Sequence, residues 1–493
     1  MGKDIVKATF DESEYRLFRE RLEESLALLG EVIRQPGFGV GPVTIGAELE
    51  LSLVNGEGRP LPYNEAIRAD IGDSRITLEL NRFNLELNAS PVPLAGRPFA
   101  ALGNELSMLL GLVTEAAAAL GGRPAVIGIL PTLTSADLSQ AMITDAARYH
   151  ALSNGLRRLR AGPFRIQIAG ADRLDLVSDE VAVEGANTSF QVHLRVAPGR
   201  FARLYNATQL ATAPALAVAG NSPTLLGHRL WEETRIALFK QSVEDRQPGP
   251  RRRHARTSLG TGWLRGGADK LFADSVRLHE PLLPVLGESD PWATVTAGQA
   301  PALDELRLHQ GTVWPWNRAI YDPVAGGHLR VEMRALPSGP TVIDMLANAA
   351  YLLGLSLWIA DQDERWTYAL PFERADHNFY RAAQYGLSAE LTWPTFRPDQ
   401  TRTARASALI AQTLPHARQG LRDAGVEAAE ADQLLDIIGA RASSGQTGAA
   451  WQCAALAAAA RTGPSAPELL AAMLGRYLEY VATGQPVHTW PAA

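Results

Sequence analysis

The sequence predicts an α+β protein in which helices back a β-sheet, followed by an alanine-rich helical region. Residues 47–53 alternate strictly between apolar and polar side chains, and residues 76–88 repeat this alternation on both sides of a turn expected near Asn81. A period of two is typical of a strand with one apolar face. Residues 100–120 are predicted to form a helix, and alanine dominates residues 386–493, where several helices are expected.

Composition excludes several classes of protein. Of the 493 residues, 46% are hydrophobic and 20% are charged, which is ordinary for a soluble globular chain with a sizeable core. The net charge of −6 gives no electrostatic reason to expect a nucleic acid or an anionic membrane as a partner. Cys453 is the only cysteine, so an intrachain disulfide and a multi-cysteine metal site are both excluded.

Two stretches bear on cellular location. Residues 1–10 lack the apolar core of a signal peptide. The longest apolar run, residues 345–360, contains Asn348, is short for a membrane span and lacks flanking lysine or arginine. We predict that this run is a buried helix and that the protein is cytoplasmic.

Polar strand faces recur in residues 189–195 and 328–334. If all these segments lie in one sheet, a shared face carries five carboxylates, two histidines and three arginines. These residues are Glu48, Glu50, Glu79, Glu86, His193, Arg195, His328, Arg330, Glu332 and Arg334.

So many carboxylates need nearby positive charge, because like charges repel and buried charges are costly to desolvate. Most of the available donors are oxygen atoms, which hard divalent cations prefer. We therefore interpret the pattern as a sheet curved around Mg²⁺ and a polyphosphate. The sequence contains neither a glycine–lysine phosphate loop nor a dinucleotide fingerprint, so ATP would bind by another route.

Simpler explanations stand beside this interpretation. A polar strand face is commonly solvated, and His193 taken alone is equally explained as a hydrogen-bonded core histidine. Glu332 lies between Arg330 and Arg334, which is also the pattern of a structural ion-pair ladder. The three arginines 251–253 lie in an irregular stretch that is either a mobile lid over phosphate or substrate, or a solvated loop.

Six motifs in order resemble the glutamate–cysteine ligase and carboxylate–amine ligase family. They are Gly46-Ala47-Glu48-Leu49-Glu50, residues 76–91, Arg148-Tyr149, Gln191-Val192-His193, Asn221-Ser222-Pro223 with Gly227 and Arg235, and residues 329–334. Together they cover roughly residues 40–380. The family's fold is related to the catalytic domain of glutamine synthetase, so the resemblance implies a curved, mainly antiparallel, funnel-like sheet.

The helix stop at Pro36-Gly37 and the change to an alanine-rich composition near residue 385 predict a division of the chain, and the resemblance implies an activity. We expect an N-terminal helix in residues 1–37, a catalytic domain in 38–385 and a helical C-terminal region in 386–493. The implied enzyme uses ATP to join a carboxylate, the γ-carboxylate of glutamate, to cysteine or another amine. The reaction passes through an acyl phosphate and releases ADP and phosphate, and the partners are a small-molecule acid and amine.

By the same resemblance, six residues would hold Mg²⁺, with Mn²⁺ as the alternative. They are Glu48, Glu50, Glu79, Glu86, His193 and Glu332. Arg330 and Arg334 would bind the nucleotide and, with His193, act in catalysis. Arg148, Tyr149 and Arg235 would bind substrate, although Arg148 and Arg235 are equally explained as surface residues of helices.

Other functions stay open at this point. A small-molecule kinase would release ADP with one substrate, whereas a ligase needs both an acid and an amine. A metal-dependent hydrolase would cleave without nucleotide, and a nucleotide-binding regulator would bind without turnover. The identity of the acid and the amine, the base that deprotonates the amine, and the existence of a homo-oligomer are not determined by the sequence.

Overall fold

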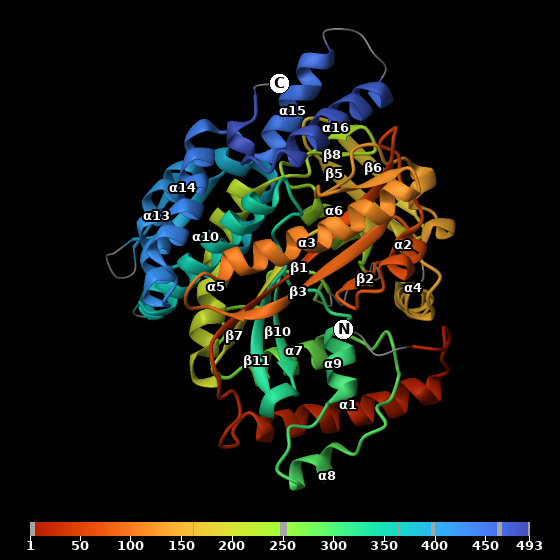
Figure 1. Cartoon of the computed structure of the whole chain (residues 1–493). Helices are drawn as coiled ribbons and strands as arrows, with labels where there is room; N and C mark the ends of the chain where they lie inside the picture. Colours follow the sequence, from red (N-terminus) through yellow and green to blue (C-terminus); the bar gives the residue numbers. More distant parts are fainter. Residues whose placement is uncertain are drawn as a thin grey trace.

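A single curled antiparallel sheet forms the centre of the molecule in the computed structural model (Figure 1). The structure describes residues 5–160, 162–246, 254–362, 364–395, 400–460 and 466–491, so arginines 251–253 lie outside the described residues. The strand order is β10-β11-β7-β1-β3-β2, and β4 also pairs with β1. The strands are β1 Thr44–Asn55, β2 Ile76–Leu78, β3 Asn84–Pro93, β4 Gly122–Ala125, β7 Phe190–Val196, β10 Asn317–Asp322 and β11 His328–Met333.

The predicted alternation places one face of this sheet in the hydrophobic core. Leu49 and Leu51 of β1 are fully buried and join the same core cluster as Leu85 and Leu87 of β3. The chain turns between β2 and β3, as the sequence predicted, and β2 pairs with β3 as an antiparallel neighbour. The polar side chains of these strands consequently share the opposite face.

The turn between β2 and β3 is fixed by Asn64, the first residue of helix α2 (Asn64–Ile71). Its buried Nδ2 donates to the backbone oxygens of Asn81 and Asn84, at 3.2 Å and 3.1 Å, and to Oγ1 of Thr144 at 3.0 Å. Thr144 Oγ1 in turn donates to the carbonyl of Glu79 at 2.6 Å. This network fixes the backbone at Glu79, the residue that directly follows β2.

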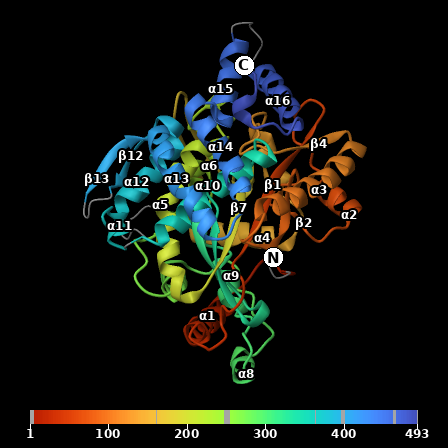
Figure 2. The ribbon, with the colours of Figure 1, turned by 60° about the vertical axis from the view of Figure 1, so that its left-hand side comes forward.

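Helices cover the apolar side of the sheet (Figures 1 and 2). Helix α3 (Pro98–Ala119) packs against β1, β3 and β4, and α5 (Phe201–Ala219) packs against β10 and β11. Helix α10 (Val342–Ala360) packs on both α3 and α5. Among the described residues, α10 is the one helix long and apolar enough to cross a membrane, but 78% of that stretch is buried within the protein. The prediction of a buried helix there is confirmed.

The alanine-rich C-terminal region is largely helical, as predicted. Helices α13 (Ala406–Asp423) and α14 (Ala428–Ser444) pack on α10 within the main core. Helices α15 (Gly448–Ala460) and α16 (Ala466–Ala482) pack together in a second hydrophobic cluster. The region also contains a hairpin that the sequence did not predict, formed by β12 (Glu390–Pro394) and β13 (Thr401–Arg405). The division at residues 37 and 385 stays a prediction.

Helix α1 (Glu12–Val32) begins at Asp11, whose side chain caps the first turn together with Glu14. With α8 it lies at the end of the molecule opposite α15 and the C-terminus (Figures 1 and 2). The remaining elements are α4 Ala147–Arg160, α6 Arg235–Ser242, α7 Asp269–Leu278, α8 Pro291–Thr296, α9 Asp304–Gln310, α11 Glu364–Tyr368, α12 Phe372–Tyr385, β5 Phe164–Ala169, β6 Arg173–Ser178, β8 Thr224–Leu225 and β9 His228–Arg229.

Candidate active site

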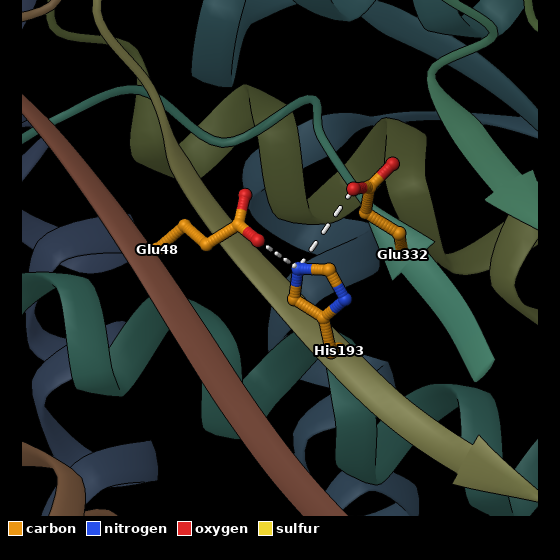
Figure 3. Close-up of side chains that lie close together, drawn as sticks. All are labelled: Glu48, His193 and Glu332. Carbon is orange, nitrogen blue, oxygen red and sulfur yellow. Dashed lines mark ion pairs between the residues drawn. The ribbon is translucent and has the colours of Figure 1, made fainter. Parts of the chain in front are cut away.

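Two groups of metal-ligand side chains lie on the polar face of the sheet. The first group is Glu48 of β1, His193 of β7 and Glu332 of β11, which come from three neighbouring strands and point toward one another (Figure 3). His193 Nε2 lies 3.0 Å from Glu48 Oε1 and 3.8 Å from Glu332 Oε1. One ligand atom from each residue falls within 4.8 Å of the others, so the three can contact a common cation.

His193 is not a hydrogen-bonded core histidine. Its side chain is buried, yet neither ring nitrogen has a partner with hydrogen-bond geometry among the described residues. The 3.0 Å approach to Glu48 therefore brings the two groups together without aligning them for a hydrogen bond. An unpaired buried imidazole nitrogen between two carboxylates fits a metal ligand.

The second group is Glu50 of β1, Glu86 of β3 and Glu79, which directly follows β2. Burial raises the pKa of Glu86 to about 8, and the charges of Glu48 and Glu50 add to the rise. Burial also raises the pKa of Glu79 well above its ordinary value, with Glu86 and Glu50 contributing. This group has an excess of negative charge, which a divalent cation would compensate.

Neighbouring amide and hydroxyl groups orient the second group. Glu50 accepts from the Ser189 amide at 2.7 Å and from Gln191 Nε2 at 3.0 Å. Glu86 Oε1 accepts from Asn88 Nδ2 at 2.9 Å and from Thr77 Oγ1 at 3.1 Å. These contacts engage both oxygens of Glu50 but only Oε1 of Glu86, and they fix the orientation of both carboxylates, as a preorganised ligand requires.

Two arginines contact Glu332, and only one of them, Arg334, was expected from the sequence. Arg318 of β10, opposite Glu332 in the register, binds it through two contacts of 2.5 Å and 2.9 Å. Arg334 lies 3.4 Å from Glu332 and donates to Gln191 Oε1 at 2.5 Å. Burial would raise the pKa of Glu332, but the charges of Arg318 and Arg334 outweigh it and lower the pKa.

The other predicted arginines occupy three different settings. Arg330 forms an ion pair with Asp322 at 3.1 Å, so it is not part of the ladder around Glu332. Arg235 is fully buried, with Nε donating to Glu233 at 3.0 Å and Nη2 to the Ala335 carbonyl at 2.5 Å, which excludes a surface role. Arg148 is exposed at the start of α4, where its charge acts on Glu79.

Tyr149 is buried next to Arg148, and its hydroxyl donates to the Leu78 carbonyl at 2.7 Å. That bond ties α4 to the end of β2, immediately before Glu79. Tyr149 is therefore connected to the site indirectly, because it holds the backbone next to the candidate ligand Glu79.

A pocket adjoins the second group. Carboxylates, two arginines and two aromatic rings line it, and the loop before β7 closes one wall. The lining residues are Glu50, Glu79, Leu80, Asn84, Glu184, Gly185, Asn187, Thr188, Ser189, Arg235, Phe239, Trp316 and Arg334.

Sequence reasoning missed Arg318 and Glu184. Arg318 follows Trp316 on a strand whose partner is revealed only by the register with β11. Glu184 lies in the short 3-10 segment Val181–Ala186, which has no periodic signal. In the sequence, the one available hint for Arg318 is its position after Trp316-Asn317 and shortly before the turn-forming residues 323–327.

A comparison with models of protein families shows which family this chain belongs to. The model of glutamate–cysteine ligase family 2 (GCS2) matches residues 44–470, which is most of the chain. The chain belongs to this family. A search of the curated proteins found no significant match for this glutamate–cysteine ligase family member.

Solved structures share the fold of this family member at low sequence identity. A glutamate–cysteine ligase from Francisella tularensis, in complex with AMP, has a TM-score of 0.51 at 10% identity, over 93% of this chain and 97% of that one. A bifunctional glutathione synthetase from Pasteurella multocida also has a TM-score of 0.51, at 12% identity, over 94% of this chain. This chain spans only 55% of the length of that synthetase.

Family membership confirms the predicted class of enzyme, an ATP-dependent carboxylate–amine ligase. The curled antiparallel sheet confirms the predicted fold. The residues of both groups fit divalent cations, because oxygen donors dominate and one buried imidazole lacks a hydrogen-bond partner among the described residues. In addition, burial and neighbouring carboxylates raise the pKa values of Glu79 and Glu86. The individual roles of these residues stay predictions.

Proposed function

We propose that this chain joins the γ-carboxylate of glutamate to cysteine or another amine, using ATP and Mg²⁺. The proposed reaction passes through a γ-glutamyl phosphate and releases ADP and phosphate. The observation that carries the proposal is the pair of convergent groups, Glu48–His193–Glu332 and Glu50–Glu79–Glu86, side by side on one sheet face. The F. tularensis relative was solved with AMP, which supports an adenine nucleotide as the ligand.

The two groups would hold Mg²⁺, with Mn²⁺ as the alternative, and the cations when bound would neutralise and align phosphate oxygens. Phosphoryl transfer depends mainly on positioning and charge stabilisation, so a rigid face of fixed ligands suits it. Gln191 links the groups, since it donates to Glu50 and accepts from Arg334. Their relative position is therefore set by the protein.

Arginines would supply the remaining positive charge. Burial alone would lower the pKa of Arg334, but the charges of Glu332, Glu50 and Glu48 outweigh it and raise the pKa, so this guanidinium stays protonated. A buried guanidinium next to the ligand groups can stabilise negative charge on the transferred phosphoryl group. We assign the same role to Arg330, whose partner Asp322 holds it on the same strand face.

The pocket beside the second group would receive the acid. Arg235 lines it and is fixed by Glu233 and the Ala335 carbonyl, which suits a guanidinium that binds a substrate carboxylate. Phe239 and Trp316 supply an apolar wall for the methylene groups of the same molecule. Arg148, exposed near Glu79, would attract anionic substrate toward the site.

A matrix of acids against amines tests the proposal. The purified protein is mixed with ATP, Mg²⁺, one acid and one amine, and both ADP and product mass are measured. We expect ADP release that requires both substrates, is greatest with glutamate, and matches the mass of a γ-glutamyl amide. ADP release with one substrate alone would assign a kinase instead. Cleavage without nucleotide would assign a hydrolase, and binding without turnover would assign a regulator.

A further inference from the structure

Glu184 is the one pocket carboxylate that the proposed metal groups leave out. It lies in the 3-10 segment Val181–Ala186 and lines the pocket together with Glu50 and Glu79. Among the described residues its side chain forms no ion pair or hydrogen bond, whereas Glu50 accepts two hydrogen bonds. Burial raises the pKa of Glu184 to about 8, and the charge of Glu50 adds to the rise. The charge of Arg334 offsets only part of this rise, so an ionised Glu184 requires a further cation.

The backbone around Glu184 is held rigidly to the metal-ligand face. Asn81 Nδ2 donates to the Ala182 carbonyl at 3.0 Å, and Asn187 Nδ2 donates to the Glu184 carbonyl at 2.6 Å. A Cβ atom at Gly185 would lie 2.6 Å from the Asn81 side chain, so only glycine allows this close approach. Asn81 belongs to the turn that follows Glu79. The distance between Glu184 and the second group is therefore fixed before any substrate binds.

The pocket combines charges of both signs in a way that matches an amino acid. Arg235 offers a buried guanidinium, Glu184 offers an unpaired carboxylate, and Glu79 marks the proposed cation group. Glutamate carries one ammonium group and two carboxylates, so its three charged groups have three complementary partners here. A dicarboxylic acid without the ammonium group would leave Glu184 desolvated and unpaired.

We infer that Glu184 binds the α-ammonium group of the acid substrate and thereby selects an α-amino acid over a plain dicarboxylic acid. This inference rests on the proposed function, since it places the reacting carboxylate at the cation groups. Glu184 contacts a part of the substrate that does not react, so its effect falls on substrate binding and specificity. The selected substrate class is an α-amino acid with a side-chain carboxylate.

The test compares L-glutamate with glutarate, which is glutamate without its ammonium group. Binding of each acid is measured by calorimetry to the full-length protein, saturated with Mg²⁺ and a non-hydrolysable ATP analogue. The variant is Glu184→Gln, and the matched control is Asp179→Asn, which removes one negative charge from an exposed position five residues earlier. Glutarate binding also reports that the variant site is folded.

We expect Glu184→Gln to weaken L-glutamate binding by about 10- to 100-fold while glutarate binding stays the same or tightens. Asp179→Asn should keep the wild-type preference. A Glu184→Gln variant that retains the preference for L-glutamate would overturn the inference, and so would a wild-type protein with no such preference. Because binding is measured without turnover, these outcomes are distinct from a failure of the proposed ligase reaction, which would show as absent ADP release.

Discussion

Glu50 and Glu86 stand directly opposite each other on the neighbouring antiparallel strands β1 and β3. Like charges in this position destabilise a sheet, and both side chains lie on the face that also carries Glu79. Among the described residues, Glu86 accepts only from the neutral side chains of Asn88 and Thr77, whereas the charges of Arg334 and Arg235 act on Glu50 and favour its ionised form. We expect this pair to destabilise the metal-free fold and a bound cation to compensate it.

Removing one of these charges should separate activity from stability. We expect Glu86→Gln or Glu50→Gln to lower turnover by about 100-fold or more, because a ligand of the cation group is lost. Glu86→Gln should also stabilise the metal-free protein by about 1 kcal/mol, because it removes the cost of burying an ionisable carboxyl group beside other carboxylates. Turnover and thermal unfolding without metal measure the two effects.

The control for these variants is Glu57→Gln, at an exposed position after β1. It removes the same charge outside the sheet face and should leave both turnover and the unfolding temperature unchanged. Near wild-type Mg²⁺-dependent turnover in both Glu50→Gln and Glu86→Gln would remove the metal-site interpretation.

Metal affinity should rise with pH. Burial and the charges of Glu48 and Glu50 raise the pKa of Glu86 to about 8, so below that pH the metal-free site holds a proton that a cation must displace. We expect Mg²⁺ binding to tighten between pH 6 and about 8 and then to level off, with proton release on binding. Calorimetry in buffers of different ionisation enthalpy measures both, and an affinity independent of pH would contradict the assignment.

The same pKa shift predicts how stability of the metal-free protein changes with pH. A raised pKa means that the folded state binds more protons than the unfolded state between the ordinary pKa of 4.5 and about 8. The free energy of unfolding should therefore fall as pH rises through this window, and Glu86→Gln should flatten the fall. A denaturant series across these pH values provides the measurement.

Much of the site followed from strand periodicity. The common face of Glu48, Glu50, His193 and Glu332 could be predicted from each strand alone. When a strand buries its apolar side chains on one face, its polar side chains lie on the other. The turn after Asn81 likewise followed from the parity of Glu79 and Glu86. These features are local in sequence, and they were enough to single out the six side chains of the two candidate groups.

The remainder depends on contacts between distant segments. Arg318 reaches Glu332 through the register of β10 and β11, and Arg330 is drawn to Asp322 across the same hairpin. Glu184 belongs to a segment whose position is set by Asn81, about a hundred residues earlier. The apolar run at residues 125–130 has the composition of a buried strand, but β4 ends at Ala125 and the buried chain beyond it makes only an isolated bridge at Ile129. Burial alone did not distinguish a strand from an extended connection.

Lysine substitutions test the arginines. Lysine keeps the charge but loses the planar fork, so Arg334→Lys cannot contact Gln191 and Glu332 together in the same way. We expect Arg334→Lys, and Arg330→Lys to a lesser degree, to lower turnover by about tenfold or more. Full activity in both variants would assign the two arginines to structural ion pairs.

Replacing Asn64 should lower both the stability of the fold and the affinity of the site for Mg²⁺. Replacement by alanine removes a buried donor from the carbonyls of Asn81 and Asn84, although Asn81 still accepts from the Asn84 amide, and it should cost about 2 kcal/mol of unfolding free energy. It should also weaken Mg²⁺ binding, since the turn that positions Glu79 loosens. Asn154→Ala removes an exposed bond to the Ala8 carbonyl and is the control. Equal unfolding free energies for the two variants would show that Asn64 does not hold the turn.

The central claim is that ATP activates the acid as an acyl phosphate on the sheet face that Glu48, Glu50, Glu79, Glu86, His193 and Glu332 define. Oxygen from the reacting carboxylate must then end in inorganic phosphate. L-Glutamate labelled with ¹⁸O at the γ-carboxylate, supplied with ATP, Mg²⁺ and the amine, should transfer one labelled oxygen to phosphate for each amide formed. Label recovered in AMP, or amide formed without any transfer to phosphate, would contradict the account even if the ligase activity itself were present.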